Sequence, residues 1–262
     1  MPVPTRRAVL SLLGLGLTMA PLATVLAQPA PTVAAAADLK FAIEEVAALF
    51  ERETGQKLRL VFGSSGTFYA QILQGAPFHL YLSADEDFVF KLADAGKTLD
   101  RGRLYARGRI GIIVPTGSPL KADPELKDLA AALNDGRLKK FAIANPEHAP
   151  YGKRAEEALR HAGLWAAIRP RLVLGENIAQ AAQFATSGAA QGGIIAQSLA
   201  MAPSVAQLGR FALIPEVWHQ PLMQRMVLLR DAPPPVRAFY NYITAPAAQA
   251  IMTRHGFTMP PD

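Results

Sequence analysis

The apolar residues of this chain alternate between short continuous runs and runs in which they recur every three or four positions. The short runs predict buried strands, and the spaced runs predict helices with one apolar face. We predict strands at 33–37, 58–62, 80–82, 110–114, 141–144, 172–174, 194–195 and 226–229. We predict helices that end at Gly55, Gly75, Gly163 and Gly188, and two further helices at 236–242 and 247–253.

This alternation of strands and helices predicts an α/β fold in which parallel sheets are covered by helices on both faces. A chain of 262 residues is long enough for one or two domains and for a cleft between two lobes. The apolar runs at 110–114 and 226–229 are expected to be the strands that cross between the lobes. At the start of the helix that ends at Gly188, Asn177 is expected to act as the cap, with Gln180 bonding back to its backbone.

Residues 1–27 have the features of an export signal. Arg6 and Arg7 precede an apolar run over 8–17, and small residues lead to Ala27, after which we expect cleavage. The run is shorter than the ~20 residues of a membrane-spanning helix. Paired arginines fit a twin-arginine signal as well as the general export route. We therefore expect a mature chain that is free in a bacterial periplasm.

Composition narrows the chemistry. The chain has no Cys, which excludes disulfides, thiolate metal sites and cysteine nucleophiles. Removing Arg6 and Arg7 with the leader lowers the formal charge from +6 to +4, and the basic residues are scattered, so we expect no nucleic-acid partner. The five His residues show no paired metal-ligand spacing, and no common hydrolase or nucleotide-binding motif is present.

Four predicted strand-to-helix turns are built from small or polar residues, at 36–38, 63–66, 148–152 and 175–178. In an open α/β sheet, ligands bind beyond the carboxyl ends of the strands, where helix N-termini present unpaired N–H groups and a partial positive charge. Converging helix N-termini would therefore form a site for an anion. Three or four charge-assisted bonds of about 1.5–3 kcal/mol each, together with helix dipoles of roughly 0.3–2 kcal/mol each, could supply the ~8–11 kcal/mol of a micromolar or tighter ligand, before ordering costs.

Each of these turn residues also has a purely structural interpretation. Ser64 or Ser65 alone is more often a helix cap than a ligand contact, and Asn177 is expected to be a cap in either case. Tyr151 is compatible with a half-buried ring whose hydroxyl is in water, and His148 with a simple turn residue.

Five segments stand out together: AAAADLKFA (34–42), FGSSGTF (62–68), QGAPFHLYLSADED (74–87), AIANPEHAPYG (142–152) and LGENIAQAAQFATSGAAQGGIIAQSLA (174–200). They resemble the periplasmic molybdate-binding proteins of ABC importers, and the resemblance covers nearly all of the predicted mature chain. The resemblance implies a two-lobed, type II periplasmic binding protein fold, in which each lobe is a mostly parallel sheet flanked by helices and the ligand lies in the cleft between lobes. It gives lobe I as 28–110 plus 223–262 and lobe II as 111–222.

The resemblance also implies a function and a site. The chain would capture molybdate or tungstate as a transported ligand, use no cofactor, work as a monomer and deliver the anion to an ABC membrane permease. Neutral donors from both lobes would bind the oxyanion, without any direct ligand to the metal. Transferred to this sequence, the binding residues are Ala37, Asp38, Ser64, Ser65, Tyr151 and Ile178, the last two through their backbone N–H groups.

Two positions depart from the pattern of that family. Many members have AAASL where this chain has AAADL, so Asp38 replaces a Ser; some members have a ligand-contacting Tyr where this chain has Ala196. Each lost hydroxyl donor predicts binding that is weaker by about ten- to a hundredfold unless another group compensates. Because a carboxylate in the cleft would repel an anion, we expect Asp38 to turn back and cap its own helix.

Three other functions stay open. Another oxyanion such as sulfate or phosphate is one alternative ligand, and Asp38 would then be the group that accepts the proton of a protonated phosphate. A serine hydrolase that uses Ser65 with His148 is a second alternative, although no residue is evident that would orient the base. A transcriptional effector domain of the same fold would need a DNA-binding module, and the export signal occupies that end of the chain.

Overall fold

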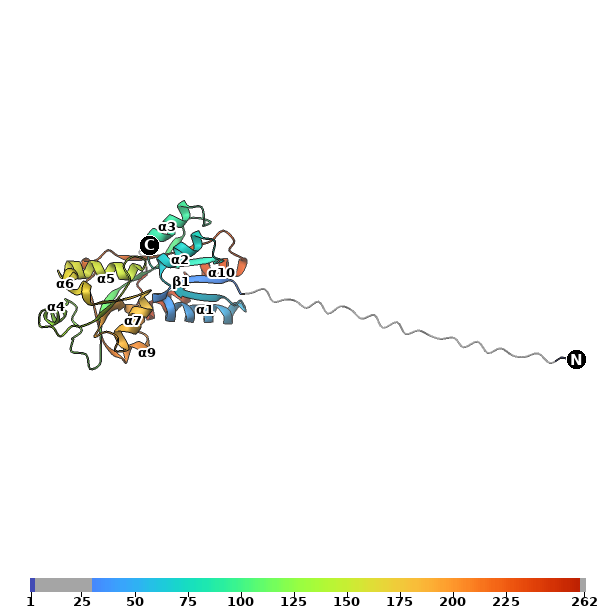
Figure 1. The fold of residues 1–262 in the computed structure, drawn as a ribbon. Coiled ribbons are helices and arrows are strands. Elements are labelled where there is room, and N and C mark those ends of the chain that lie inside the picture. The colour runs from blue at the N-terminus through green and yellow to red at the C-terminus, as the bar shows by residue number, and fades with distance from the viewer. Residues whose placement is uncertain (3–29, 260–262) are drawn as a thin grey trace.

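The computed structural model describes residues 1–2 and 30–259. The predicted export signal at 1–27 therefore lies almost entirely outside the described residues. The described chain forms two five-stranded sheets, each flanked by helices, which confirms the predicted two-lobed α/β architecture. In Figure 1, helices α4, α5, α6, α7 and α9 gather around one sheet, and α1, α2, α3 and α10 gather around the other.

The first sheet has the strand order β2-β1-β3-β10-β4, and the second has the order β7-β6-β8-β5-β9. The strands are β1 (Thr32–Ala36), β2 (Arg59–Gly63), β3 (Leu80–Ser83), β4 (Arg103–Gly108), β5 (Ile110–Pro115), β6 (Phe141–Ala144), β7 (Leu172–Gly175), β8 (Gly193–Ala196), β9 (Gly209–Leu213) and β10 (Leu222–Leu228).

The α-helices of the described residues are α1 (Lys40–Thr54), α2 (Ser65–Leu73), α3 (Asp87–Asp94), α4 (Lys127–Asn134), α5 (Pro150–His161), α6 (Trp165–Ile168), α7 (Ile178–Thr186), α8 (Gln197–Ala200), α9 (Pro203–Ala206), α10 (Pro234–Tyr242) and α11 (Pro246–Arg254). Short 3-10 helices are η1 (Ala37–Leu39), η2 (Arg169–Arg171) and η3 (Glu216–Trp218).

Both sheets are mixed, and each contains one strand that opposes the others. In the first sheet, β1 pairs in parallel with β2 and β3, whereas β10 pairs antiparallel with both β3 and β4. The second sheet repeats this plan with β5 as the opposing strand. These are the two strands predicted to cross between lobes. The chain enters each of them directly from the other sheet, so they run against their neighbours.

Small and branched side chains form the centres of the two lobes. Strand β1 has the sequence TVAAA and is almost wholly buried, and alanines on β6 and α7 are likewise buried. Small residues let α7 pack closely on the second sheet. Gly55 ends α1 in the left-handed conformation (φ 70°), as the sequence predicts.

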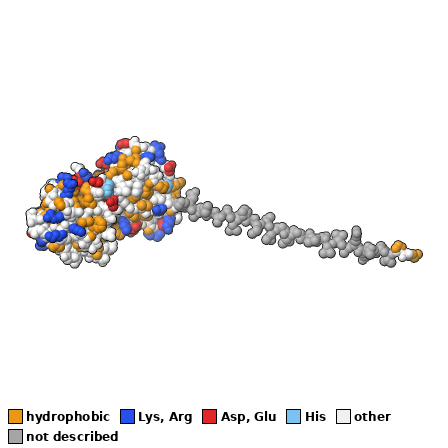
Figure 2. Space-filling view, viewed as in Figure 1, with side chains coloured by type: hydrophobic (Ala, Val, Ile, Leu, Met, Phe, Trp, Pro, Cys, Tyr) orange, Lys and Arg blue, Asp and Glu red, His pale blue; other side chains and the backbone are white. Residues whose placement is uncertain are grey.

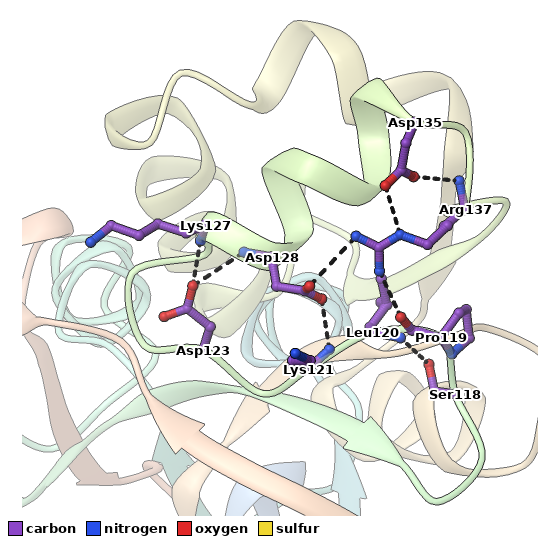
Figure 3. Close-up of polar contacts among 9 residues, drawn as sticks. All are labelled: Ser118, Pro119, Leu120, Lys121, Asp123, Lys127, Asp128, Asp135 and Arg137. Carbon is purple, nitrogen blue, oxygen red and sulfur yellow. Dashed lines mark hydrogen bonds and ion pairs between the residues drawn. The ribbon is translucent and has the colours of Figure 1, made fainter.

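The strands β4 and β9, the helices α3 and α4, and the short helices α6, α8 and α9 were not predicted. Both strands lie at the edges of their sheets, where one side of the backbone faces away from the sheet and polar residues interrupt the apolar pattern. At the start of α4, the amides of Lys127 and Asp128 donate to Asp123, which precedes the helix, and Arg137, which follows it, reaches Asp128 (Figure 3). This helix is therefore organised by polar contacts rather than by an apolar stripe alone.

The surface carries no concentrated stripe of basic residues in the view of Figure 2, where Lys and Arg are scattered among acidic and uncharged side chains. Within the part of the chain that the structure describes, no helix combines the length and apolar character needed to span a membrane.

Candidate functional site

The four predicted turns meet at one cavity. A small cavity lies between the C-terminal ends of strands from both sheets and the helices that follow them. The lining residues are Ala36, Ala37, Asp38, Gly63, Ser64, Ser65, Ala84, Ala149, Pro150, Tyr151 and Ile178. All six residues predicted to bind the ligand are among them. No Lys, Arg or His belongs to this lining, so the cavity offers neutral donors and one carboxyl.

Ser65 is placed to donate its hydroxyl proton into the cavity. It is the first residue of α2, it is 1% exposed, and its Oγ accepts a bond from the amide of Ala84 at 3.0 Å. A hydroxyl has one proton to donate. Because the contact with Ala84 uses only an oxygen lone pair, the Ser65 proton stays available for an oxyanion.

Ser64 caps α2 instead. Its Oγ accepts the amide proton of Thr67 and contacts the Thr67 hydroxyl at 2.7 Å, as expected for an N-cap. The same oxygen lies 3.0 Å from His148 Nδ1, which belongs to the loop between β6 and α5. His148 therefore pairs with Ser64, and the described structure does not form the Ser65–His148 pair of the hydrolase alternative.

A main-chain contact closes the two lobes beside this pair. The amide of Gly66 donates to the carbonyl oxygen of His148 at 2.9 Å. A Cβ on Gly66 would lie 2.6 Å from that oxygen, so the approach requires glycine. His148 Nε2 also lies 3.5 Å from a carboxylate oxygen of Glu176, at the start of the turn before α7. The described conformation is thus one in which the lobes touch.

Helices α7 and α5 each begin with an amide that has no partner among the described residues. Asn177 Oδ1 accepts the amides of Ala179 and Gln180, as predicted, so the first amide of α7, that of Ile178, has no partner among the described residues. In α5, Pro150 occupies the first position, and Tyr151 presents the first N–H. Each of these amides lies at the positive end of a helix dipole.

One detail of the predicted cap at α7 is wrong. Gln180 Oε1 accepts the amide of Glu176 at 2.7 Å and not that of Asn177. The backbone at Asn177 is extended (φ −150°, ψ 175°). The Gln180 side chain, on the first turn of α7, therefore bonds to the amide of Glu176, one residue before Asn177. The glutamine still ties the turn to the helix, so the turn that carries the Ile178 amide is fixed at both ends.

Asp38 differs most from its prediction. It lies within η1 and caps no helix, because its carboxylate Oδ2 accepts bonds from the Tyr151 hydroxyl (3.0 Å) and from Gln224 Nε2 (2.6 Å). Its other oxygen, Oδ1, is buried without a partner in the described structure. The half-exposed interpretation of Tyr151 is also wrong, since its side chain is 2% exposed and its hydroxyl joins the two lobes at Asp38.

Burial controls the protonation of this cluster. Desolvation raises the pKa of Asp38 to about 6, although the bonds from Gln224 and Tyr151 oppose the shift. Burial and the nearby Asp38 also raise the pKa values of Tyr151 and Tyr105 well above their usual range, so both phenols stay neutral. An ionised Asp38 would repel each unit charge of an anion 4 Å away by about 4 kcal/mol at an effective dielectric of about 20.

Gln224 was missed by sequence reasoning although it completes the site. It is fully buried on β10, and its Oε1 accepts a bond from the Tyr105 hydroxyl at 2.8 Å. The polar pair Gln224–Arg225 interrupts the apolar run, which is why the predicted strand began only at 226. The register with β4 shifts between these two residues, a local irregularity of the kind that re-aims a side chain near a site.

Gly108 makes room for Tyr151, whereas Ala196 lies outside the cavity lining. A Cβ on Gly108 would lie 2.1 Å from the Tyr151 hydroxyl oxygen, so glycine makes room for this tyrosine at the end of β4. Ala196 ends β8 fully buried and is not part of the cavity lining. Beside it on α8, Ser198 donates to the carbonyl oxygen of Asp38 at 2.8 Å, a further bond between the lobes.

The comparisons with known proteins agree with this geometry. Residues 31–258 match the family described as bacterial extracellular solute-binding protein, so the chain belongs to that family. A solute-binding protein of two lobes takes up its ligand between them, which is the arrangement that the cavity and its donors from both lobes present.

Particular relatives narrow the comparison. The chain is 34% identical to the molybdate-binding protein ModA of Azotobacter vinelandii, over 86% of this chain and 88% of that protein. It is 33% identical to the protein of the same name from Rhodobacter capsulatus, over 86% of each. The solved periplasmic molybdate-binding protein of A. vinelandii superposes with a TM-score of 0.80 at 28% identity, covering 88% of this chain and all of that one.

Proposed function

We propose that this protein is an exported receptor that captures molybdate or tungstate and delivers the anion to an ABC-type membrane permease. The observation that carries the proposal is the convergence of donors from both lobes on one cavity without a basic side chain in its lining. Relatives named for molybdate binding, at 33–34% identity over most of their length, support this oxyanion as the ligand.

In the proposed complex, Ser65 donates through its hydroxyl and its amide, while Tyr151 and Ile178 donate through their amides from the other lobe. The amides of Ala37 and Asp38 complete the first turn, and Ser64 holds α2 in place from its cap position. Tetrahedral oxyanions have four oxygens, each of which accepts more than one bond, so these donors suit such a ligand. No residue coordinates the metal directly.

The lobes are proposed to comprise residues 28–110 with 223–262, and residues 111–222. The strand order supports this division, because β5 begins at Ile110 and β10 begins at Leu222, beside the proposed boundaries. Closure would be a hinge motion at these two crossings, and a ligand that contacts both lobes would favour the closed form, which the permease recognises. A monomer suffices, since one chain supplies the whole site.

Another oxyanion, sulfate or phosphate, is the second candidate ligand, and the carboxyl of Asp38 is the observation that favours phosphate. An ionised Asp38 accepts the proton of a protonated phosphate, which neutral donors alone do not. The donors of the cavity do not by themselves distinguish oxyanions of similar charge.

A thermal-shift panel decides between the ligands. The chain without residues 1–27 is heated at pH 6 with molybdate, tungstate, sulfate or phosphate. Ligand at a hundred times its Kd stabilises the native state by about 2.7 kcal/mol, which raises Tm by several degrees. We expect this rise with molybdate and tungstate. A rise with sulfate or phosphate alone would contradict the assignment, and ester hydrolysis by the same sample would favour the enzyme alternative.

A further inference from the structure

The carboxyl of Asp38 has one satisfied and one unsatisfied oxygen. Tyr151 and Gln224 both donate to Oδ2, whereas Oδ1 is buried without a hydrogen-bond partner among the described residues. Asp38 is 1% exposed, and it lines the cavity together with Ser65 and Ile178. Leaving a buried polar atom without a partner is costly. An unpartnered oxygen at the wall of a ligand cavity therefore indicates that the bound state supplies its partner.

No cationic side chain among residues 1–2 and 30–259 pairs with this carboxyl. Asp38 forms no salt bridge with any described residue. The elements β1, α7 and α8, next to it, carry no ionisable side chain, and Lys40 at the start of α1 is exposed. A doubly negative ligand and an ionised Asp38 would then share one cavity without a compensating charge.

Other ionisable groups lie around the site and have to be separated from Asp38. Tyr151 on α5 and Tyr105 on β4 are neutral phenols that face the cluster. His148 and Glu176 lie at the cavity edge, where His148 contacts Ser64. Asp85, in the loop after β3, is a second mostly buried carboxyl, and it accepts bonds from Ser83 and Phe88 rather than facing the cavity.

Resting on the proposed oxyanion function, we propose that the cavity captures its dianion together with one proton, shared between Asp38 Oδ1 and a ligand oxygen. The proton comes from solvent. The complex can be described in two ways: a neutral Asp38 carboxyl donates the proton to a dianion, or an Asp38 carboxylate accepts it from a protonated anion. Both descriptions contain the same atoms and the same total charge. In either form Oδ1 gains the partner that it lacks, and the two negative groups no longer repel each other.

Binding then depends on pH in a defined way. Burial raises the pKa of Asp38 to about 6, so the unliganded site already holds the proton well below pH 6 and has lost it well above. Below about pH 5, affinity is constant and no proton is taken up. Above about pH 7, each bound anion takes up close to one proton, and Kd rises about tenfold per pH unit.

The test uses sodium molybdate and the chain without residues 1–27. Isothermal titration calorimetry at pH 7.5, in two buffers of different ionisation enthalpy, counts the protons taken up; Kd is also measured from about pH 5 to 8. We expect close to one proton per anion and a Kd that rises about tenfold between pH 7 and pH 8. In Asp38→Asn, the amide oxygen still accepts the bonds from Tyr151 and Gln224, and the NH₂ group donates to the ligand. We therefore expect no proton uptake and a Kd that does not change with pH.

The matched control is Asp85→Asn, which removes the other buried carboxyl and is expected to keep the slope. A slope that persists in Asp38→Asn would assign the proton to another group, such as His148 or Asp85, and would overturn the proposal. A wild-type protein that binds molybdate with the same Kd at every pH also overturns it while leaving the proposed function intact. Absence of binding at any pH rejects both. Should Asp38→Asn fail to fold, the wild type and Asp85→Asn still test the proposal, through the number of protons taken up and the dependence of Kd on pH.

Discussion

Single residues at the cavity divide into those that donate to a ligand and those that hold the donors. Ser65 has a free hydroxyl proton, whereas Ser64, its neighbour, uses its oxygen for the cap of α2 and for the contact with His148. Adjacent residues of the same type thus have different roles, and their hydrogen-bond partners distinguish them.

Replacing Ser65 by Ala is expected to weaken molybdate binding by about ten- to a hundredfold, because one charge-assisted bond of about 1.5–3 kcal/mol is lost. Calorimetric titration measures the change. Ser187→Ala, at an exposed serine at the C-terminal end of α7, serves as the control and is expected to bind as the wild type does. Equal affinity of Ser65→Ala and Ser187→Ala would remove Ser65 from the site.

The sequence predicts the residues that line the cavity but not how Asp38 is bonded. Turn composition and family resemblance identify the loops, because small residues and caps occur next to one another along the chain. The partners of Asp38 come from Tyr151 and Gln224, which lie 113 and 186 residues away. Contacts of this kind depend on how two lobes meet, and no local pattern encodes that.

At the scale of elements, the termini of α2, α5 and α7 determine the geometry of the site. Their order along the chain was predicted because each begins at a turn of small or polar residues and ends near a glycine or a change of pattern. The edge strands β4 and β9 were missed because their polar residues weaken the alternation. Their omission narrows each predicted sheet and leaves out Tyr105 and Gly108 of β4, which contact Gln224 and Tyr151, but no residue of either strand belongs to the cavity lining.

Gly66→Ala is expected to hinder closure of the lobes. The added Cβ would lie 2.6 Å from the His148 carbonyl oxygen, so α2 and the loop before α5 must separate. We expect molybdate affinity to fall by at least about tenfold, since one interlobe bond worth about 1 kcal/mol is lost along with alignment of the donors. Small-angle X-ray scattering should show a smaller ligand-induced compaction than in the wild type. Ala70→Gly, on the exposed side of the same helix, is the control for helix stability.

Asn177→Ala removes the cap of α7. Two first-turn amides lose their acceptor, so the free energy of unfolding is expected to fall by about 0.5–2 kcal/mol. Urea denaturation measures this fall. Asn177→Asp, which keeps a capping oxygen, is expected to recover most of the stability; if it proved as unstable as Asn177→Ala, the side-chain oxygen would not be what matters.

At the scale of the whole molecule, the raised pKa of Asp38 makes stability depend on pH even without ligand. The folded state binds a proton more tightly than the unfolded chain does, because the pKa rises from 3.8 to about 6 on folding. At a pH between 3.8 and about 6, unfolding therefore releases a proton from Asp38. Stability from this group is complete below about pH 4 and is lost as the pH rises through about 6.

Asp38→Asn is therefore expected to stabilise the unliganded protein at pH 7.5 relative to the wild type. The gain is up to about 3 kcal/mol, because the wild-type carboxylate is ionised at this pH although burial raises its pKa to about 6. The advantage should disappear near pH 4, where the wild-type carboxyl is also neutral. Urea unfolding of both proteins at the two pH values measures it. A constant difference at both would point to altered packing instead of titration.

The position of β10 within the first sheet also determines the order in which the lobes are completed during synthesis. The second sheet has all of its strands once Leu213 has been made, whereas the first sheet lacks the strand between β3 and β4 until residues 222–228 emerge. A ribosome-bound or partly translocated chain thus holds β1 to β4 without the strand that joins β3 to β4. The earliest part of the polypeptide is the last to become a finished lobe, and a truncation before residue 222 is expected to leave that lobe unfolded while the other keeps its sheet.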